Sequence, residues 1–331
     1  MEELKNYPIS ISETIRSRSI VRQYVKPTQL LYYEGLSKLL GANIYIKHEN
    51  HNPTGTFKIR GGVTLMHHLK QKGITGVITF STGNHGLSIA TAAKWFGLTA
   101  VVVVPKNNNP VKNRAIIECG AELVEAGATF EEASLTVDEL CRERDLYYAH
   151  PANEPLIING VGTEFLEIVE DLPDIDVMIV PLGAGSEAAA AITTLRAFRP
   201  DIKIIAVQAK DSPAAYNSWQ KNEICHAANT TFAGGFATGK AYELTFELFK
   251  DGLDDFVLIS EDEIYDAIAL ALYHTHNLAE GAGASSIMAA FKLREKLKGK
   301  NVVLQMSGCN ASLEEIKKAC ERRAFHNGEP E

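Results

Sequence analysis

The sequence has few cysteines, and none of them is spaced as in a zinc site or a disulfide-rich domain. The five cysteines stand at positions 119, 141, 225, 309 and 320, an odd and scattered set without a C-x-x-C pair. Zinc sites and disulfide frameworks need closely spaced or paired cysteines. This usage is typical of a reducing compartment, and we expect a cytoplasmic location.

Long apolar runs and an excess of positive charge are also missing. No stretch approaches the roughly 20 apolar residues of a membrane-spanning helix, and the polar start Met1–Lys5 does not resemble a secretory signal. The formal net charge of −8 disfavours a nucleic-acid partner held through its phosphates. We therefore expect neither a membrane nor a nucleic-acid partner, whereas a small anionic ligand needs only a local site.

Apolar runs and segments of helical periodicity alternate through most of the 331 residues. The run Ala100–Val104 is apolar throughout, as in a parallel strand buried on both faces. Strands separated by helices predict an α/β protein with two open, mostly parallel twisted sheets flanked by helices. We expect a small domain at residues 75–150 and a large domain formed by residues 1–74 and 151–331.

The predicted elements follow from these patterns. Strands are expected at residues 44–47, 77–80, 100–104, 121–124, 146–149, 176–181, 203–208, 255–259 and 301–306. Helices are expected at residues 34–41, 84–96, 111–119, 129–143, 157–171, 187–198, 240–250, 261–276, 284–298 and 312–322. Residues 210–238 are polar and predict an irregular stretch.

Lys58 differs from a typical surface lysine because apolar residues flank it. It follows the turn-forming run Asn50–Gly55 and lies between Phe57 and Ile59, at an expected helix start. Burial beside apolar groups lowers the pKa of a lysine amine and makes the amine a nucleophile toward a carbonyl group. On local context alone, a solvated lysine beside a turn explains these residues at least as well.

Three predicted strands end in unusual loops, where open parallel sheets bind ligands. Ser81–Gly86 is rich in small residues and precedes a helix, which suits a substrate carboxylate. Gly183–Ser186 is the kind of loop that cradles a phosphate, and Ser307–Asn310 places a neutral hydroxyl at a strand end. Taken alone, the first and third loops are better explained as turns that cap a helix.

The second loop also matches a loose dinucleotide-binding pattern, G-x-G-x-x-A, through Ala188. That interpretation requires an acidic residue for the ribose at the end of the next strand, which instead ends at Gln208. The combined features suit another cofactor, pyridoxal 5′-phosphate. Its aldehyde reacts with a lysine, its phosphate needs backbone N–H groups, and its ring nitrogen needs one partner.

With these motifs in the same order, the chain resembles the fold-type II pyridoxal-phosphate enzymes, specifically the serine/threonine dehydratase and serine racemase group with its tryptophan synthase β-like fold. The resemblance extends from about Pro27 to Asn310. Its motifs are Asn52–Gly61 (NPTGTFKIRG), Ser81–Gly86 (STGNHG), Gly120–Glu122 (GAE), His150–Pro151 (HP), Gly160–Glu164 (GVGTE), Ala279–Gly283 (AEGAG) and Ser307–Asn310 (SGCN).

The resemblance implies a role for each candidate residue around the cofactor, which the large domain would bind. Lys58 would form the Schiff base with the cofactor and later move protons, and Phe57 would pack beside it. Asn84 would meet the ring hydroxyl, Ser307 would face the ring nitrogen, and Glu280 would lie near the ring.

The same resemblance assigns the two anion-binding loops. The phosphate would be held by Gly183, Ala184, Gly185 and Ser186. The substrate carboxylate would be bound, mostly through backbone N–H groups, by Ser81, Thr82, Gly83 and His85.

This chain departs from the family pattern at several positions. Ala184 and Ser186 replace glycines of the phosphate loop, Cys309 replaces the second glycine of the last motif, and Val161 stands where glutamine is common. These departures leave the implied cofactor unchanged and leave the substrate open.

We expect no metal ion. Relatives often bind a divalent cation through carboxylates near Gln208 and Ala214, which are not acidic here, and only Asp211 could contribute charge. His274 and His276 are expected to be structural or exposed.

The implied activity is α,β-elimination of a β-hydroxy amino acid, such as L-threonine or L-serine, to a 2-oxo acid and ammonia. A 3-substituted serine, such as phenylserine or 3-hydroxyaspartate, is an alternative substrate. Racemisation is the nearest alternative activity, but the racemase pattern has a serine at the position of Thr82, whose methyl group restricts its rotamers.

Two further alternatives are β-replacement, as in cysteine synthase, and an amino-acid sensor on an inactivated scaffold. His85 argues against the first, because that group resembles Thr-Ser-Gly-Asn-Thr at this loop, and intact Lys58 and Asn84 argue against the second. We expect a homodimer, and neither a regulatory domain after residue 331 nor feedback control by isoleucine.

Overall fold

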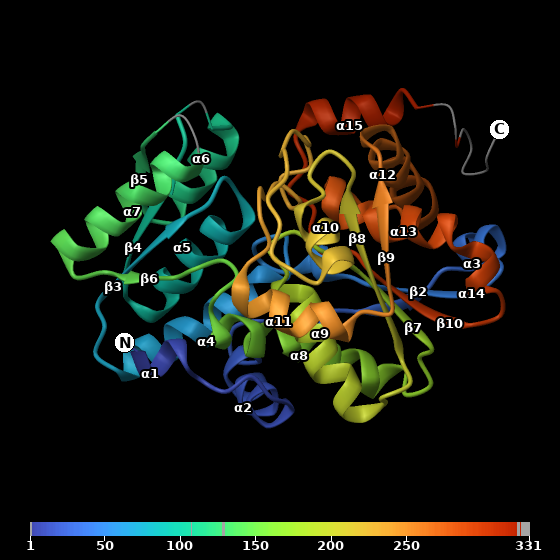
Figure 1. Ribbon diagram of the computed structural model, residues 1–331, viewed down its shortest axis with the longest axis horizontal. Coiled ribbons are helices and arrows are strands. Elements are labelled where there is room, and N and C mark those ends of the chain that lie inside the picture. The colour runs from blue at the N-terminus through green and yellow to red at the C-terminus, as the bar shows by residue number, and fades with distance from the viewer. Residues whose placement is uncertain (1, 107, 128–129, 323–324, 326–331) are drawn as a thin grey trace. The chain divides into compact units, whose positions relative to one another are not determined.

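The computed structural model describes residues 2–106, 108–127, 130–322 and 325, which form two compact units. Unit 1 comprises Met1–Lys26 and Lys58–Thr163, and unit 2 comprises Pro27–Phe57 and Glu164–Glu331. Each unit contains one β-sheet flanked by helices (Figure 1). The boundary between the units falls between Phe57 and Lys58, directly before the candidate lysine.

The sheet of unit 1 has four strands in the order β5-β4-β3-β6, and its pairs are parallel. The strands are β3 (Gly76–Phe80), β4 (Thr99–Val104), β5 (Glu122–Glu125) and β6 (Tyr147–Tyr148). Ile78, Val101 and Val103 pack in one buried cluster with Val137 of the helix α7 (Phe130–Arg144). The intervening Val102 is also fully buried, so both faces of the central strands are covered.

The helices of unit 1 include the helix that begins with Lys58. They are α1 (Glu2–Lys5), α2 (Ile11–Val21), α4 (Lys58–Gln71), α5 (Asn84–Phe96), α6 (Pro110–Glu118), α7 (Phe130–Arg144) and the first part of α8 (Pro155–Asp171). The predicted helix 129–143 corresponds to α7, except that residue 129 lies outside the described residues.

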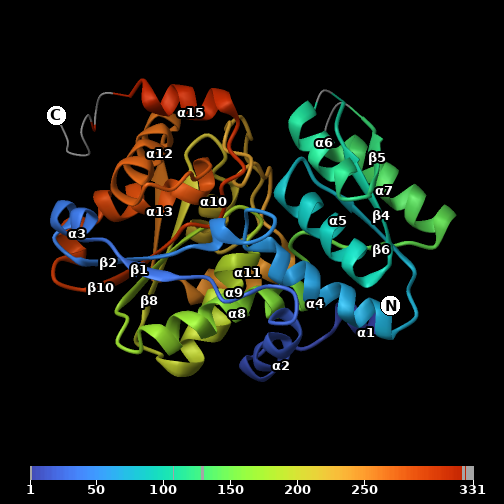
Figure 2. The same ribbon diagram turned by 180° about the vertical axis from the view of Figure 1, so that it is seen from behind.

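The sheet of unit 2 has six strands in the order β1-β2-β10-β7-β8-β9. They are β1 (Leu30–Tyr32), β2 (Asn43–Lys47), β7 (Val177–Pro181), β8 (Lys203–Ala209), β9 (Asp255–Ile259) and β10 (Asn301–Gln305). The edge strand β1 is antiparallel to β2 and lies beside it in Figure 2, whereas the other pairs are parallel.

The helices of unit 2 pack against this sheet or against other helices. They are α3 (Glu34–Leu40), η1 (Glu49–His51), α9 (Ser186–Phe198), α10 (Ala214–Lys221), α11 (Glu243–Gly252), α12 (Glu261–Thr275), α13 (Gly281–Lys292), α14 (Arg294–Leu297) and α15 (Leu313–Cys320).

The core of unit 2 lies between the strands and α13. Ile179 of β7, Val207 of β8 and Leu304 of β10 share one buried cluster with Ile287 of α13. Because successive strand residues point to opposite faces, Val180 points the other way, and it is fully buried as well. Since α9 packs on β7 and β8, the strands read as continuous apolar runs in the sequence.

The predicted fold class is confirmed: the protein has two mostly parallel sheets flanked by helices. The expected helix 284–298 is interrupted at Leu293, giving α13 and α14, and residues 210–238 contain the unpredicted helix α10. The predicted division at residues 75–150 stays a prediction, and the compact units additionally place residues 1–26, 58–74 and 151–163 with the smaller sheet.

Candidate active site

Three adjacent strands of unit 2 end at the same edge of its sheet. β2, β10 and β7 are parallel neighbours, with Leu304 paired to both Ile46 and Ile179. Their carboxyl ends therefore release residues 48–57, 306–310 and 182–186 side by side. This is the edge at which open parallel sheets bind ligands.

The segment that leads to Lys58 is fixed against the loop after β10. The Phe57 N–H donates to the Ser307 carbonyl at 3.1 Å, and the Cys309 N–H donates to the Gly55 carbonyl at 2.9 Å. Asn310 Nδ2 adds a bond to the Thr54 carbonyl at 3.0 Å. Consecutive Cα atoms lie about 3.8 Å apart, so these bonds fix the chain one residue before Lys58.

Gly55 is required by the tightness of this pairing. Its φ of +67° is in the left-handed region, and a Cβ there would lie 3.0 Å from Cys309 Sγ. Lys58 itself is half-buried and is the first residue of α4, between buried Phe57 and Ile59. The apolar flanks predicted for Lys58 are thus present.

Glu280 lies against the same loop. Its N–H donates to the Gly308 carbonyl at 3.1 Å, and a Cβ on Gly308 would lie 2.8 Å from Glu280 Oε1. Burial, and secondarily the charge of Glu280, raises the pKa of the Cys309 thiol. A raised pKa disfavours the reactive thiolate, so Cys309 acts here as a packing residue.

The loop after β7 forms a cradle at the start of α9. Gly185 has φ of +92°, and a Cβ at Gly183 would lie 2.0 Å from the Gly235 carbonyl oxygen. Thr245 Oγ1 fixes the loop by donating to the Ala184 carbonyl at 2.8 Å. The backbone at Ala184 is not left-handed, so alanine is accommodated there.

The backbone amides of this cradle are available to a ligand. Within the described residues, the N–H groups of Gly183, Ala184, Gly185 and Ser186 have no hydrogen-bond acceptor in the protein. Four such donors at the positive end of a helix dipole fit a phosphate group. The residues present therefore fit the phosphate of the predicted cofactor.

The predicted carboxylate loop belongs to unit 1 and follows β3. The Ser81 N–H donates to the Val103 carbonyl at 3.1 Å, and Ser81 Oγ accepts from the Gly83 N–H at 3.2 Å. Asn84 is the first residue of α5. In the described part of the chain, the N–H groups of Thr82, His85 and Gly86 have no acceptor.

His85 is neutral, so any positive charge near the loop Ser81–Gly86 comes from residues outside the loop. Burial, and secondarily the positive charge of Lys58, lowers the pKa of His85 to about 3. Its Nε2–H donates to the Ala149 carbonyl at 3.1 Å, which leaves Nδ1 without a proton. Lys112 of α6 packs across Gly83, with Nζ 3.7 Å from the position of a Cβ there.

Comparison with known proteins gives the same cofactor as these loops. The family described as "Pyridoxal-phosphate dependent enzyme" matches residues 21–308. The chain belongs to this family. Its cofactor is accordingly pyridoxal 5′-phosphate, as the cradle after β7 and the lysine after the paired segment had suggested.

Individual relatives narrow the comparison within the family. The L-threonine ammonia-lyase of Geobacter sulfurreducens is 37% identical over 305 residues, which cover 91% of this chain and 76% of that protein. Maize serine racemase superposes with a TM-score of 0.90 at 25% identity, covering 95% of this chain and 97% of that one. Processed threonine deaminase isoform 2 from Solanum lycopersicum gives 0.87 at 31% identity, covering 97% and 88%.

The candidate residues fall into two groups by unit. Unit 2 brings together Phe57, Glu280, Ser307 and the loop 183–186, whereas unit 1 contains Lys58, Asn84, Ser81, Thr82, Gly83 and His85. The roles assigned to them remain predictions.

Sequence reasoning missed several buried polar residues that support these loops, namely Thr28, Lys47, Glu49, Glu167 and Thr245. A lysine ending the apolar strand Ile44–Lys47 was the one available indication, and its carboxylate partner Glu167 is 120 residues away in the chain.

Near Gln208, where we expected no metal ion, the structure has a hydrogen bond between β8 and α10. Gln208 Oε1 accepts from the Tyr216 N–H at 3.1 Å, at the first turn of α10. Among the described residues, no group of three or more His, Cys, Asp or Glu side chains is arranged to hold a metal ion. His276 is not on α12 but caps its end, with φ of +56°.

In the part of the chain that the structure describes, none of the helices is both long and apolar enough to cross a bilayer.

Proposed function

We propose that this protein is a pyridoxal-phosphate-dependent ammonia-lyase that converts a β-hydroxy amino acid, L-threonine or L-serine, to a 2-oxo acid and ammonia. The observation that carries the proposal is the edge of the unit 2 sheet. There the segment that ends directly before Lys58 is paired with residues 307–310, beside four backbone amides open to a phosphate. The L-threonine ammonia-lyase relative supports the choice of reaction.

Different residues of the protein would bind different parts of the cofactor. Lys58 Nζ would hold its aldehyde carbon covalently, and the amides of residues 183–186 would bind its phosphate. Asn84 would bind the ring hydroxyl, Phe57 would pack beside the ring, and Glu280 would lie near it. When bound, pyridoxal 5′-phosphate supplies a carbonyl that condenses with amines and a ring that accepts electron density from the substrate α-carbon.

Binding of the substrate carboxylate is assigned to the loop after β3, through Ser81, Thr82, Gly83 and His85. The open N–H groups at the start of α5 favour an anion. Because His85 is neutral, Lys112 supplies formal positive charge beside the loop. This arrangement would orient the α-C–H bond toward Lys58 Nζ, which takes up the proton once the substrate amine has displaced it.

Ser307 favours elimination over transamination. A serine hydroxyl facing the ring nitrogen does not enforce protonation of that nitrogen, as a carboxylate would. Less negative charge is then stabilised on the ring, so prompt departure of the β-hydroxyl is favoured. Ser307 therefore supports loss of the β-substituent over transamination, and a β-hydroxyl, which is a poor leaving group, would need a proton as it departs.

A second candidate activity, racemisation, is supported by the likeness to maize serine racemase. It requires an acid on the opposite face of the substrate from Lys58, a role for which Thr82 is the candidate. We rank it below elimination, because a threonine side chain is restricted at χ1.

The two activities are separated by their products. A panel of L-threonine, L-serine, phenylserine and 3-hydroxyaspartate is incubated with the enzyme, and 2-oxo acid and each amino-acid enantiomer are quantified. We expect 2-oxo acid and ammonia in equal amounts from L-threonine or L-serine. Accumulation of the opposite enantiomer without 2-oxo acid would instead establish a racemase.

We also propose a cytoplasmic location and a homodimer for this enzyme. The scattered cysteines support the first proposal, and the second rests on the family resemblance. The mass of the protein in solution, measured by light scattering, tests the dimer.

A further inference from the structure

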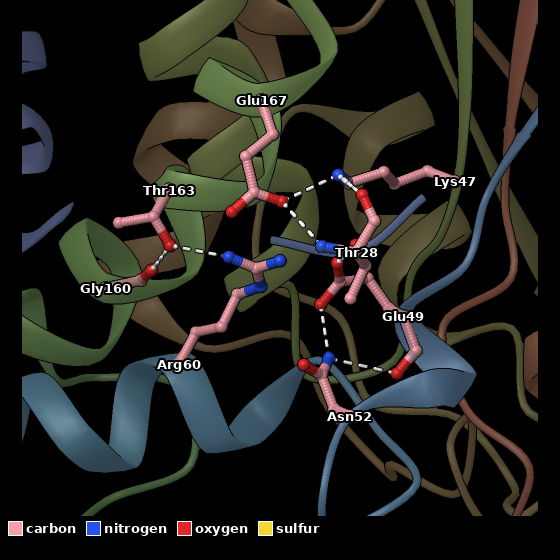
Figure 3. Close-up of polar contacts among 8 residues, drawn as sticks. All are labelled: Thr28, Lys47, Glu49, Asn52, Arg60, Gly160, Thr163 and Glu167. Carbon is pink, nitrogen blue, oxygen red and sulfur yellow. Dashed lines mark hydrogen bonds and ion pairs between the residues drawn. The ribbon is translucent and has the colours of Figure 1, made fainter. Parts of the chain in front are cut away.

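A buried network of polar side chains in unit 2 includes Glu49 and Asn52, which belong to the segment that leads to Lys58 (Figure 3). Lys47, the last residue of β2, is fully buried, and its Nζ lies 2.6 Å from Glu167 Oε2 of α8. Lys47 Nζ also donates to the Thr28 carbonyl at 2.8 Å, and the Thr28 N–H donates to Glu167 Oε2 at 3.2 Å. Thr28 is therefore fixed by its backbone on both sides.

Glu49 continues the network toward the turn before Lys58. Its side chain is fully buried, and its two oxygens accept from different residues. Oε1 accepts from the Thr28 hydroxyl, and Oε2 accepts from Asn52 Nδ2 at 2.6 Å. Figure 3 shows the Glu49 carboxylate between these two partners.

Asn52 connects Glu49 to the turn that ends at Gly55. Its Nδ2 also donates to the Glu49 carbonyl at 3.0 Å, and its own carbonyl accepts from the Gly55 N–H at 2.7 Å. Gly55 is in turn bound by Cys309. A continuous series of bonds thus connects Thr28 to the residues that immediately precede Lys58.

We infer that Glu49, oriented by Thr28, is a positioning residue that sets where the chain delivers Lys58 to the cofactor. A buried carboxylate is costly unless hydrogen bonds compensate it, so its geometry is tightly determined by its partners. Loss of the Thr28 hydroxyl removes one hydrogen bond from the Glu49 carboxylate, which also accepts from Asn52, and this loss would loosen the turn before Lys58. The inference rests on the role proposed above for Lys58.

The helix that begins at Lys58 has its own anchor within unit 1. Arg60 is fully buried, and its Nη1 donates to Thr163 Oγ1 at 3.2 Å, which donates to the Gly160 carbonyl at 2.7 Å (Figure 3). Glu49 thus bonds to the segment before Lys58, and Arg60 bonds to Thr163 from the first turn of the helix that begins at Lys58.

Thr28→Val and Thr28→Ser form the test pair, since valine keeps the shape and removes the hydroxyl, while serine keeps the hydroxyl. The full-length chain is titrated with pyridoxal 5′-phosphate, and the lysine-bound cofactor is quantified by its visible absorbance and by borohydride trapping with peptide mass analysis. Thr28→Val should raise the Kd of the cofactor about tenfold, the effect of losing a hydrogen bond to a buried carboxylate. Thr28→Ser should stay within about twofold of the wild type.

Glu49→Gln is a second, isosteric variant, and we expect it to slow trapping and raise the cofactor Kd as Thr28→Val does. Asp266→Asn is the matched control: Asp266 is a buried carboxylate of the same unit, paired with Arg322 and outside the network. It should lower thermal stability without changing the cofactor Kd.

Two results would overturn the inference. The first concerns Glu49 alone, and the second concerns the proposed role of Lys58. Normal trapping at Lys58 with an unchanged Kd in Thr28→Val and Glu49→Gln shows that the network only stabilises the fold. Trapping of the wild type at another lysine overturns the proposed role of Lys58 and, with it, that of Glu49.

Discussion

At the scale of single residues, the predicted site depends on side chains whose charge state is set by burial. His85 is the clearest case, because desolvation and the nearby charge of Lys58 both oppose its protonation. A neutral His85 keeps the Nε2–H bond to Ala149 and leaves the carboxylate loop to its backbone amides. Protonation would instead place a buried, uncompensated cation beside a lysine.

The neutral state of His85 makes the protein sensitive to acid. The unfolded histidine binds a proton near its ordinary pKa of 6.5, whereas the folded one does so only near a pKa of about 3. Between these values the unfolded state binds more protons, so stability falls as the pH decreases. Relative to His85→Gln, the wild type should lose about 2 kcal/mol of unfolding free energy between pH 7 and pH 5.

Urea denaturation of both proteins at the two pH values measures this difference. Burial also lowers the pKa of His48, to about 4, but that residue is present in both proteins and cancels in the comparison. If the difference between wild type and variant does not change with pH, His85 is not buried in its neutral form.

At the scale of elements, close approaches of backbone position the helices and loops of the site. Glycines allow these approaches in both units, at the phosphate cradle and where α4 packs on α8. A methyl group is large enough to disturb either contact. Each contact can therefore be tested by one alanine substitution.

In the cradle, Gly183→Ala would place a Cβ 2.0 Å from the Gly235 carbonyl, so the loop must move. We expect the affinity for pyridoxal 5′-phosphate to fall by about tenfold to a hundredfold. Ala184→Gly in the same loop restores the family's residue and should leave the Kd within about threefold of the wild type. Equal affinities for Gly183→Ala and wild type would show that the phosphate is held elsewhere.

At the contact of α4 with α8, a Cβ on Gly160 would lie 2.6 Å from the Arg60 carbonyl. Gly160→Ala should therefore lower the unfolding free energy by about 1–3 kcal/mol, measured by urea denaturation. Gly239→Ala is the control, since the nearest atom, the Ala227 carbonyl oxygen, would lie 3.8 Å from its Cβ. A Gly160→Ala protein as stable as this control contradicts the close packing.

At the scale of the whole molecule, local patterns predicted the fold class and the loops at the strand ends. The buried strands and the cradle Gly183–Ser186 are each contained in a few consecutive residues, so their chemistry is visible in the sequence. The Glu49 network could not be predicted in this way, because Lys47 and Glu167 are 120 residues apart. Helix α10 was missed because its polar sequence buries only a few small residues, such as Ala214 and Ser218.

The sequence did not predict the grouping of residues into the two compact units. Strand and helix patterns do not show which neighbours a helix contacts, and α4 was predicted to belong to the large domain with residues 1–74. That division stays a prediction, and the compact units group α4 with α5 and the smaller sheet. The chain thus changes from one unit to the other between Phe57 and Lys58, at the candidate lysine itself.

The most direct test of the proposed mechanism compares the wild type with Lys58→Ala on L-threonine and L-serine. Formation of 2-oxo acid and ammonia is measured with both proteins loaded with pyridoxal 5′-phosphate. We predict equal amounts of both products from the wild type and a rate about a thousandfold lower from the variant, the loss expected for a proton-transferring group. A Lys58→Ala protein that retains the wild-type rate would contradict the assignment of Lys58 as the catalytic residue.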